Sequence, residues 1–265
     1  MSPVHPFFRE AGSGPGVVCV HANASTSGQW KDLMALLAPR FHVLAADSYG
    51  SGQSPEWPSD SRIALRDEAA LLEPVLARAG TPLVLAGHSY GAAVALVAAL
   101  ANPGRVRALV LYEPTLFALI DGHSTPPNAA DGARDTVARA TLALDDGNLD
   151  EAARIFIDYW MGPGAWDATP PNRQPAIAAS VKNLRRWGHA LLTEPTPLQA
   201  FSALDMPVLL TSGDRSTPAA HAVSARLETV LPRLERVNFP ELGHMGPVTH
   251  PAVVNAAIAR FLQAL

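Results

Sequence analysis

A serine occupies the centre of residues 87–91, whose sequence is G-H-S-Y-G. The apolar run 82–86 before this segment predicts a strand, and the alanine-rich run 92–100 after it predicts a helix. Ser89 would then lie at the apex of a sharp turn, where the flanking glycines let strand and helix approach without a Cβ clash. The start of the helix would also favour a developing negative charge. The pattern predicts a nucleophilic serine.

A serine hydroxyl is a weak nucleophile at neutral pH, so this chemistry needs a histidine as general base and a carboxylate that orients it. His244 follows a short predicted strand near 235–239 and lies on a loop. Asp214 occupies a loop after the apolar strand 207–211, and Glu113 follows an earlier predicted strand. We expect Asp214 to be the acid, with Glu113 as the alternative.

The order of serine, acid after a late strand and Gly-His near the end resembles the α/β-hydrolase superfamily along nearly the whole chain. Segment 17–23, V-V-C-V-H-A-N, resembles the family's strand and oxyanion loop, and segment 47–54, D-S-Y-G-S-G-Q-S, resembles its D-x-x-G-x-G-x-S loop. The resemblance implies that the backbone N–H groups of Asn23 and Tyr90 bind an oxyanion. It also implies a helical cap over the site.

Two segments depart from the family pattern. Ala22 stands where the family usually has glycine, so a positive φ at that position would be costlier. Asn23 is therefore the better candidate for the oxyanion N–H. Residues 211–214, T-S-G-D, keep the spacing of the family's G-x-x-D acid loop without its first glycine.

The remaining histidines have weaker signals. His88 is expected to be packed rather than catalytic, and His21 to orient the oxyanion loop by hydrogen bonding. His250 precedes a predicted helix start, and five others lack any paired motif: His5, His42, His123, His189 and His221. No H-E-x-x-H or C-x-x-C spacing occurs and Cys19 is the only cysteine, so we expect neither a metal site nor a cofactor.

Composition limits the partners. A formal net charge of -4 and a pI near 6.1 disfavour nucleic acid and anionic membranes. One cysteine excludes an intramolecular disulfide, the first residues lack the basic start and apolar core of a signal peptide, and no apolar run approaches the ~20 residues of a membrane span. We expect a cytoplasmic monomer or homodimer that acts on a small molecule.

These side chains need a sheet to bring them together, because Ser89 and His244 are far apart in the chain. Predicted strands alternate with predicted helices, which favours a mostly parallel, doubly wound α/β sheet whose functional loops gather at the carboxyl ends of the strands. A first hairpin turning at 12–16 is expected to form an antiparallel edge. The strands are expected near 5–9, 17–21, 41–46, 82–87, 106–112, 207–212 and 235–239, and the helices near 28–38, 62–79, 90–101, 219–231 and 251–264.

Strand signals disappear after Pro114 and return after about Leu204. The segment between carries helical stretches at 133–144, 149–160 and 177–192, and it resembles the superfamily's cap. We therefore expect a core of residues 1–114 and 205–265 and a cap of residues 115–204. Its aromatic side chains could line an apolar chamber or only fill the interior of the cap: Phe117, Phe156, Tyr159, Trp160, Trp166 and Trp187. The candidate pocket residues are His21, Trp160, Trp187 and Met245.

The predicted function is hydrolysis of a small, apolar carboxylic ester, lactone or thioester through an acyl-enzyme. A serine at residue 89 argues against haloalkane dehalogenase and epoxide hydrolase chemistry, for which the superfamily uses aspartate at that position. Two alternatives stay open. The same triad could serve cofactor-free lyase, carbon–carbon hydrolase or oxygenase chemistry with His244 as base, or the chain could be a non-catalytic ligand receptor.

Overall fold

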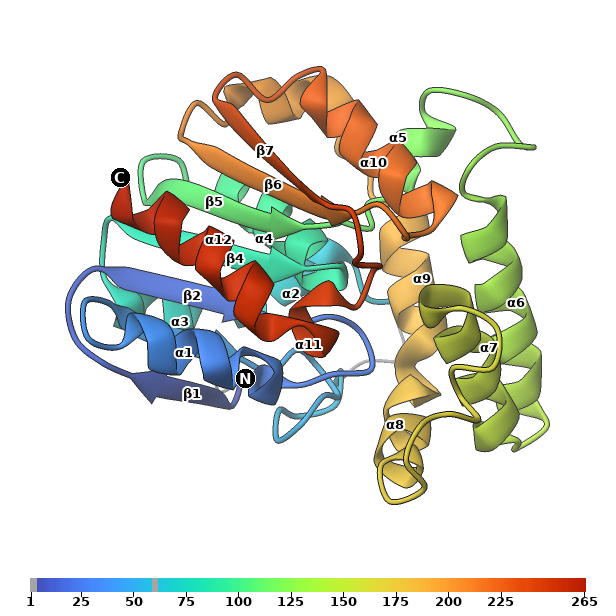
Figure 1. The fold of residues 1–265 in the computed structure, drawn as a ribbon. Coiled ribbons are helices and arrows are strands. Elements are labelled where there is room, and N and C mark those ends of the chain that lie inside the picture. The colour runs from blue at the N-terminus through green and yellow to red at the C-terminus, as the bar shows by residue number, and fades with distance from the viewer. Residues whose placement is uncertain (1–3, 59–61) are drawn as a thin grey trace.

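Seven strands form one sheet in the order β1-β3-β2-β4-β5-β6-β7 (Figure 1). The computed structural model describes residues 4–58 and 62–265. Only β1 runs antiparallel to its neighbour, and all other neighbouring strands are parallel. The predicted α/β fold class is therefore confirmed. The strands are β1 (Phe8–Ala11), β2 (Gly16–Val20), β3 (His42–Ala46), β4 (Leu83–His88), β5 (Val106–Tyr112), β6 (Val208–Gly213) and β7 (Leu234–Phe239).

Alternate side chains of the central strands enter two apolar layers. Val17 and Cys19 of β2 face one layer, and Val18 and Val20 face the other. Because both faces are covered, these strands are apolar throughout. The first layer is closed by η1 (Ser27–Trp30), α1 (Lys31–Leu37) and α12 (Pro251–Gln263), and the second by α2 (Leu65–Leu71), α3 (Glu73–Ala79), α4 (Tyr90–Ala101) and α10 (Pro218–Glu228).

The edge strand β1 corrects one expectation. It is antiparallel and lies at the edge, as predicted, but it pairs with β3 instead of forming a hairpin with β2. The His42 N–H donates to the carbonyl of Pro15 at 3.0 Å, so β3 begins against the turn that separates β1 from β2. A run of glycines between two strands predicts a reversal of the chain, but it does not specify which strand becomes the neighbour.

Residues 115–204, which we call the helical insertion, join β5 to β6. The structure describes the whole segment and finds helices and turns in it but no strand. In Figure 1 its helices lie beyond the carboxyl ends of the parallel strands. The predicted helix at 177–192 is divided by a short 3-10 turn. The elements are α5 (Ala118–Asp121), α6 (Asp131–Asp145), α7 (Leu149–Met161), α8 (Gln174–Ser180), η2 (Val181–Asn183), α9 (Leu184–Leu192) and η3 (Leu198–Ala203).

The start and end of α7 follow from its sequence. The Asn148 side chain accepts a hydrogen bond from the Glu151 N–H at 3.0 Å, and two acidic residues lie in the first turn, where the helix dipole favours negative charge. Gly162 ends the helix with a φ of 100°. This helix therefore has a defined register, and two of its buried residues, Phe156 and Ile157, line the cavity beside Ser89.

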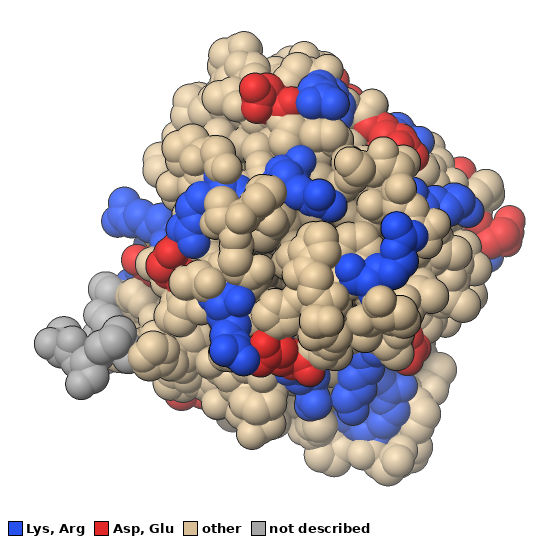
Figure 2. Space-filling view, turned by 90° about the vertical axis from the view of Figure 1, so that its left-hand side faces the viewer, with Lys and Arg blue, Asp and Glu red and all other residues tan. Residues whose placement is uncertain are grey.

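The surface opposite the insertion carries mixed charge. Figure 2 shows that face, and Asp and Glu lie among the Lys and Arg over it. Among the described residues, no helix is both long and apolar enough to cross a membrane.

Candidate active site

Ser89 lies at the junction of β4 and α4, in a backbone conformation that L-residues rarely adopt. Its φ is 57° and its ψ is -117°. The Ser89 N–H donates to the carbonyl of Tyr112 at 2.9 Å, which fixes the turn to the end of β5. Such strain costs of order 1–3 kcal/mol and is found where surrounding contacts hold a functional residue in place. The structure has the predicted strand, sharp turn and helix.

The two glycines beside Ser89 are required by close approach. A Cβ on Gly87 would lie 2.4 Å from the carbonyl oxygen of Gly91, and a Cβ on Gly91 would lie 2.2 Å from the carbonyl oxygen of Val20. Both distances are far below van der Waals contact, and both involve backbone atoms, which cannot rotate away. Glycine at these positions lets α4 begin directly against β2 and β4.

His244 joins the serine to a carboxylate. Its Nε2 lies 2.9 Å from the Ser89 Oγ, and its Nδ1 lies 2.6 Å from the Oε2 of Glu113. A carboxylate can only accept, so Nδ1 carries the ring proton and Nε2 accepts from the serine hydroxyl. The exposed fractions are 4% for Ser89, 2% for His244 and 0% for Glu113. The three side chains form a buried series in which a hydroxyl, an imidazole and a carboxylate are joined by hydrogen bonds.

The carboxylate of Glu113 is held by the loop after β6. Its Oε1 accepts the Gly213 N–H at 2.7 Å, and its Oε2 accepts the hydroxyl of Ser216 at 2.5 Å in addition to His244. The backbone φ of Glu113 is 42°, which turns the chain sharply after β5. These contacts supply the hydrogen bonds that a buried carboxylate requires.

Asp214 does not occupy the position expected for it. Its side chain is exposed, and among residues 4–58 and 62–265 it forms no hydrogen bond to His244, whose Nδ1 contacts Glu113 instead. Its backbone N–H donates to the carbonyl of Phe239 at 3.0 Å. The two candidates lie at the ends of neighbouring strands, so either loop could have reached the histidine. The positive φ at Glu113 directs that carboxylate inward.

The loop that carries His244 is held by two buried side chains. The Nε2 of His88 donates to the backbone carbonyl of His244 at 2.8 Å, and the hydroxyl of Tyr112 donates to the carbonyl of Gly243, also at 2.8 Å. Burial lowers the pKa of His88 well below its usual value, so this ring is neutral. His88 is packed, as expected, and it positions the loop from beneath.

The loop after β2 is braced by His21. The Nε2 of this ring accepts the Ser48 N–H at 3.1 Å, so Nδ1 carries the proton and donates to the carbonyl of Ala22 at 2.7 Å. Burial lowers the pKa of His21, which keeps it neutral. His21 has the expected hydrogen bonds to its own loop. It does not line the cavity beside Ser89, which differs from the expectation that it is a pocket residue.

The segment after β3 braces the same loop. The Asp47 carboxylate accepts the Ser27 N–H at 2.5 Å and the Gln53 N–H at 3.0 Å. In the loop after β2 the left-handed residue is Ala24, with a φ of 53°, rather than Ala22. Alanine at residue 22 therefore meets no backbone conflict.

A cavity of about 570 Å³ opens above Ser89, within the size range of small-molecule sites. Its floor includes Asn23 and Thr115, and Met245 lines it as predicted. The insertion supplies most of the walls. The large apolar side chains that line it are Phe156, Ile157, Trp160, Met161, Ile177, Leu191, Met245 and Val248.

The aromatic residues of the insertion divide into wall and interior. Trp160 lines the cavity, and its ring stacks on the imidazole of His244 with centroids 3.9 Å apart. Trp187 is only 2% exposed, does not line the cavity and contacts the ring of Tyr90. The expectation that Trp187 is a pocket residue is therefore wrong. Because α9 turns this side chain toward α4, it joins the insertion to the core.

A buried carboxyl that the sequence did not single out lies beside Tyr90, the residue that follows Ser89. Glu68 on α2 accepts the Tyr90 hydroxyl at 3.1 Å and the Tyr49 N–H at 3.2 Å. Burial raises the pKa of Glu68 to about 7. The sequence does contain a signal, because Glu68 is three residues after Leu65 and so falls on the apolar face of its helix. Glu68 connects the helix start at Tyr90 to the loop after β3.

Glu68→Gln should reduce the pH dependence of stability. Folding raises the Glu68 pKa from 4.5 to about 7, so the folded protein retains a proton that the unfolded chain releases. This stabilisation is complete below pH 4.5 and is lost as pH rises through 7. At pH 8 the loss amounts to about 3 kcal/mol in the free energy of unfolding. Denaturant titrations from pH 5 to 8 should show a shallower decline for Glu68→Gln than for the wild type.

The exposed Glu73 offers a control. Glu73→Gln should follow the pH dependence of the wild-type protein. Equal pH dependence in the wild type and Glu68→Gln would mean that Glu68 ionises in the folded protein as it does in the unfolded chain.

Several known proteins resemble this chain along nearly its whole length. A family model described as "Alpha/beta hydrolase family" matches residues 17–257. The chain is 31% identical over 267 residues to Lipase LipV of Mycobacterium tuberculosis, covering 93% of each protein. It is 28% identical over 264 residues to a 2-(acetamidomethylene)succinate hydrolase of Mesorhizobium japonicum, covering 97% of this chain and 91% of that one. A solved alpha/beta hydrolase from Sphaerobacter thermophilus has a TM-score of 0.69 and 26% identity, covering 94% of this chain and 95% of that one.

Proposed function

This chain belongs to the alpha/beta hydrolase family, and from that premise we propose that it cleaves a small, largely apolar carboxylic ester, lactone or thioester through an acyl-enzyme on Ser89. The observation that carries the proposal is the buried hydrogen-bond series from Ser89 through His244 to Glu113 at the floor of a cavity. Two relatives are named as a lipase and a 2-(acetamidomethylene)succinate hydrolase, which supports hydrolysis without selecting one kind of bond.

The proposed mechanism begins when the Ser89 Oγ attacks the carbonyl carbon and His244 Nε2 takes its proton. Glu113 holds the ring tautomer and stabilises the imidazolium that forms. The backbone N–H groups of Asn23 and Tyr90 would bind the oxyanion. At Tyr90 this follows from helix geometry, because the first N–H groups of α4 have no acceptor within the helix. His244 then protonates the leaving group, and water releases the acyl group through the same base.

The helical insertion would act as the cap that selects the substrate. Its side chains form most of the apolar wall, whereas the catalytic side chains come from the loops after β4, β5 and β7. Chemistry and selection would therefore reside in different parts of the chain.

Covalent labelling tests the nucleophile. A fluorophosphonate should add one label per wild-type chain, because His244 activates the Ser89 hydroxyl for attack on phosphorus. Intact-protein mass spectrometry should show the mass of one label in the wild type and none in Ser89→Ala. Equal labelling of both proteins would refute the assignment. A folded wild-type protein that takes no label and is only stabilised by esters would be a receptor.

Trp160→Ala should alter the preference for acyl chain length. Removing this wall enlarges the cavity where an apolar chain would lie, and a pocket discriminates by about 1–3 kcal/mol per methylene. The measurement is kcat/KM over p-nitrophenyl esters from acetate to decanoate. The ranking should move toward longer chains, together with a general fall in rate because Trp160 also stacks on His244.

Trp187→Ala is the matched control, since Trp187 is buried away from the cavity. It should lower stability by about 3–5 kcal/mol and leave the ranking of esters unchanged. A uniform loss over all esters in Trp160→Ala would assign Trp160 to support of His244 alone.

A further inference from the structure

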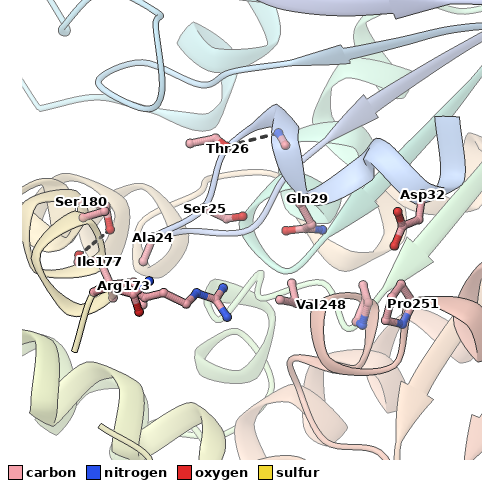
Figure 3. A pocket seen from close by; sticks show the side chains of 14 residues that line it. Ala24, Ser25, Thr26, Gln29, Asp32, Arg173, Ile177, Ser180, Val248 and Pro251 are labelled. Carbon is pink, nitrogen blue, oxygen red and sulfur yellow. Dashed lines mark hydrogen bonds between the residues drawn. The ribbon is translucent and has the colours of Figure 1, made fainter. Parts of the chain in front are cut away.

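Arg173 places a cation at the mouth of the catalytic cavity. It precedes α8, and its side chain lines both this cavity and an outer hollow of about 530 Å³. The two spaces also share Ala24, Ser25, Ile177 and Val248, so they lie next to each other. In Figure 3 the Arg173 side chain extends from the insertion toward Val248. A molecule that reaches from Ser89 to the outside would pass the guanidinium.

The charge of Arg173 has no ion-pair partner in the described part of the chain. Many other arginines do form ion pairs. Among the described residues that line the cavity beside Ser89, only Arg173 carries a permanent charge. No Asp or Glu is among these lining residues. Asp32 is the one described carboxylate lining the outer hollow. On the side that faces the cavity beside Ser89, the Arg173 guanidinium could therefore bind an anion.

Beside Ser89, the cavity is lined by uncharged polar groups. Among the described residues, the hydroxyl of Thr115 and the amide oxygen of Asn23 are buried without a hydrogen-bond partner, and both residues line the cavity beside Ser89. Buried groups of this kind cost free energy unless something pairs with them. The Thr115 hydroxyl can donate to an oxygen of an ester group, and the Asn23 amide oxygen can accept from water. The apolar walls between floor and mouth suit methylene groups.

We propose that Arg173 binds a carboxylate at the distal end of the substrate, so that the preferred substrates are esters whose carbon chain ends in an acid group. This rests on the proposed hydrolytic function. The planar guanidinium presents paired N–H donors that match the two oxygens of a carboxylate, and the charge strengthens both hydrogen bonds. The polar floor, apolar middle and cationic mouth each match one part of such a molecule.

Arg173 is exposed, so the competing explanation is a solvated surface charge without a function. The two explanations differ in one measurable quantity, which is discrimination between a charged and a neutral substrate of equal length. A solvated cation far from the substrate would leave that discrimination unchanged when it is removed.

The test compares monoethyl esters of straight dicarboxylic acids of four to eight carbons with ethyl esters of the monocarboxylic acids of equal length. The rate of hydrolysis is measured from the protons that the reaction releases. The quantity compared is the ratio of kcat/KM for the acidic ester to kcat/KM for the neutral ester. The wild-type ratio should exceed one and peak at one chain length. Arg173→Gln should lower the ratio at that length at least tenfold, and Arg173→Lys should retain part of it.

Arg40→Gln is the matched control. Arg40 is exposed and precedes β3, at the amino ends of the parallel strands and so away from the cavity. It should keep the wild-type ratio. Added salt should lower the ratio in the wild type more than in Arg173→Gln, because screening acts on the lost interaction.

The outcomes separate the two proposals. Cleavage of neutral esters with the same ratio in wild type and Arg173→Gln would overturn the carboxylate site and leave the hydrolase proposal intact. A folded wild-type protein that hydrolyses neither series and takes no fluorophosphonate would overturn the proposed hydrolysis itself, and the carboxylate site with it.

Discussion

Replacing His244 by glutamine is expected to lower kcat by about 10⁶-fold. The ring is the only described side chain that contacts both Ser89 and Glu113, so its loss removes activation of the nucleophile and protonation of the leaving group together. Adding Ser89→Ala to His244→Gln should cause little further loss, since residues that act as one unit are not additive. Steady-state kinetics of the single and double variants on one activated ester would measure this.

A second histidine–glutamate pair provides the control. His42 lies 2.6 Å from Glu10 through its Nε2, but at the amino end of β3. His42→Gln should keep wild-type kcat. A His244→Gln protein that folds and loses less than tenfold would remove His244 from the reaction.

Glu113→Gln is expected to lower kcat by up to about 10⁴-fold while the protein stays folded. The amide oxygen can still accept the Gly213 N–H, but the NH₂ group would then face Nδ1 of His244 and favour the wrong ring tautomer. Asp214→Asn should change kcat by less than about twofold, because that side chain is exposed. Circular dichroism checks that both variants fold, and their kcat values show which carboxylate acts with His244.

The reverse ranking would return the acid to the loop after β6. Glu113→Asp supplies a further check, because it keeps the charge but shortens the side chain. It should be less active than the wild type and more active than Glu113→Gln.

The sequence predicted the sheet well because its signals are local. Buried parallel strands are continuous apolar runs, and they alternate along the chain with helical segments. The turn at Ser89 was equally predictable, since two glycines at fixed spacing between a strand and a helix leave few other geometries. The role of His244 could be predicted from its place after the last strand.

The features that could not be predicted from the sequence depend on contacts between residues that are far apart in the chain. The choice between Glu113 and Asp214 depends on a positive φ after β5 and on hydrogen bonds from Gly213 and Ser216, about 100 residues away in the chain. The direction of Trp187 depends on how α9 packs against α4. Both are tertiary properties, which residue type and spacing do not encode.

The stacking of Trp160 on His244 has a dynamic consequence. The indole belongs to α7, whereas the imidazole belongs to the core, so one contact joins His244, the proposed base, to the insertion. An aromatic face also attracts a cation, and a displaced ring would admit water. Any hinge motion of the insertion would therefore change both access to the site and the packing of the His244 ring. Substitutions at its hinges, far from Ser89, should therefore change turnover, because product release and proton transfer would share one conformational step.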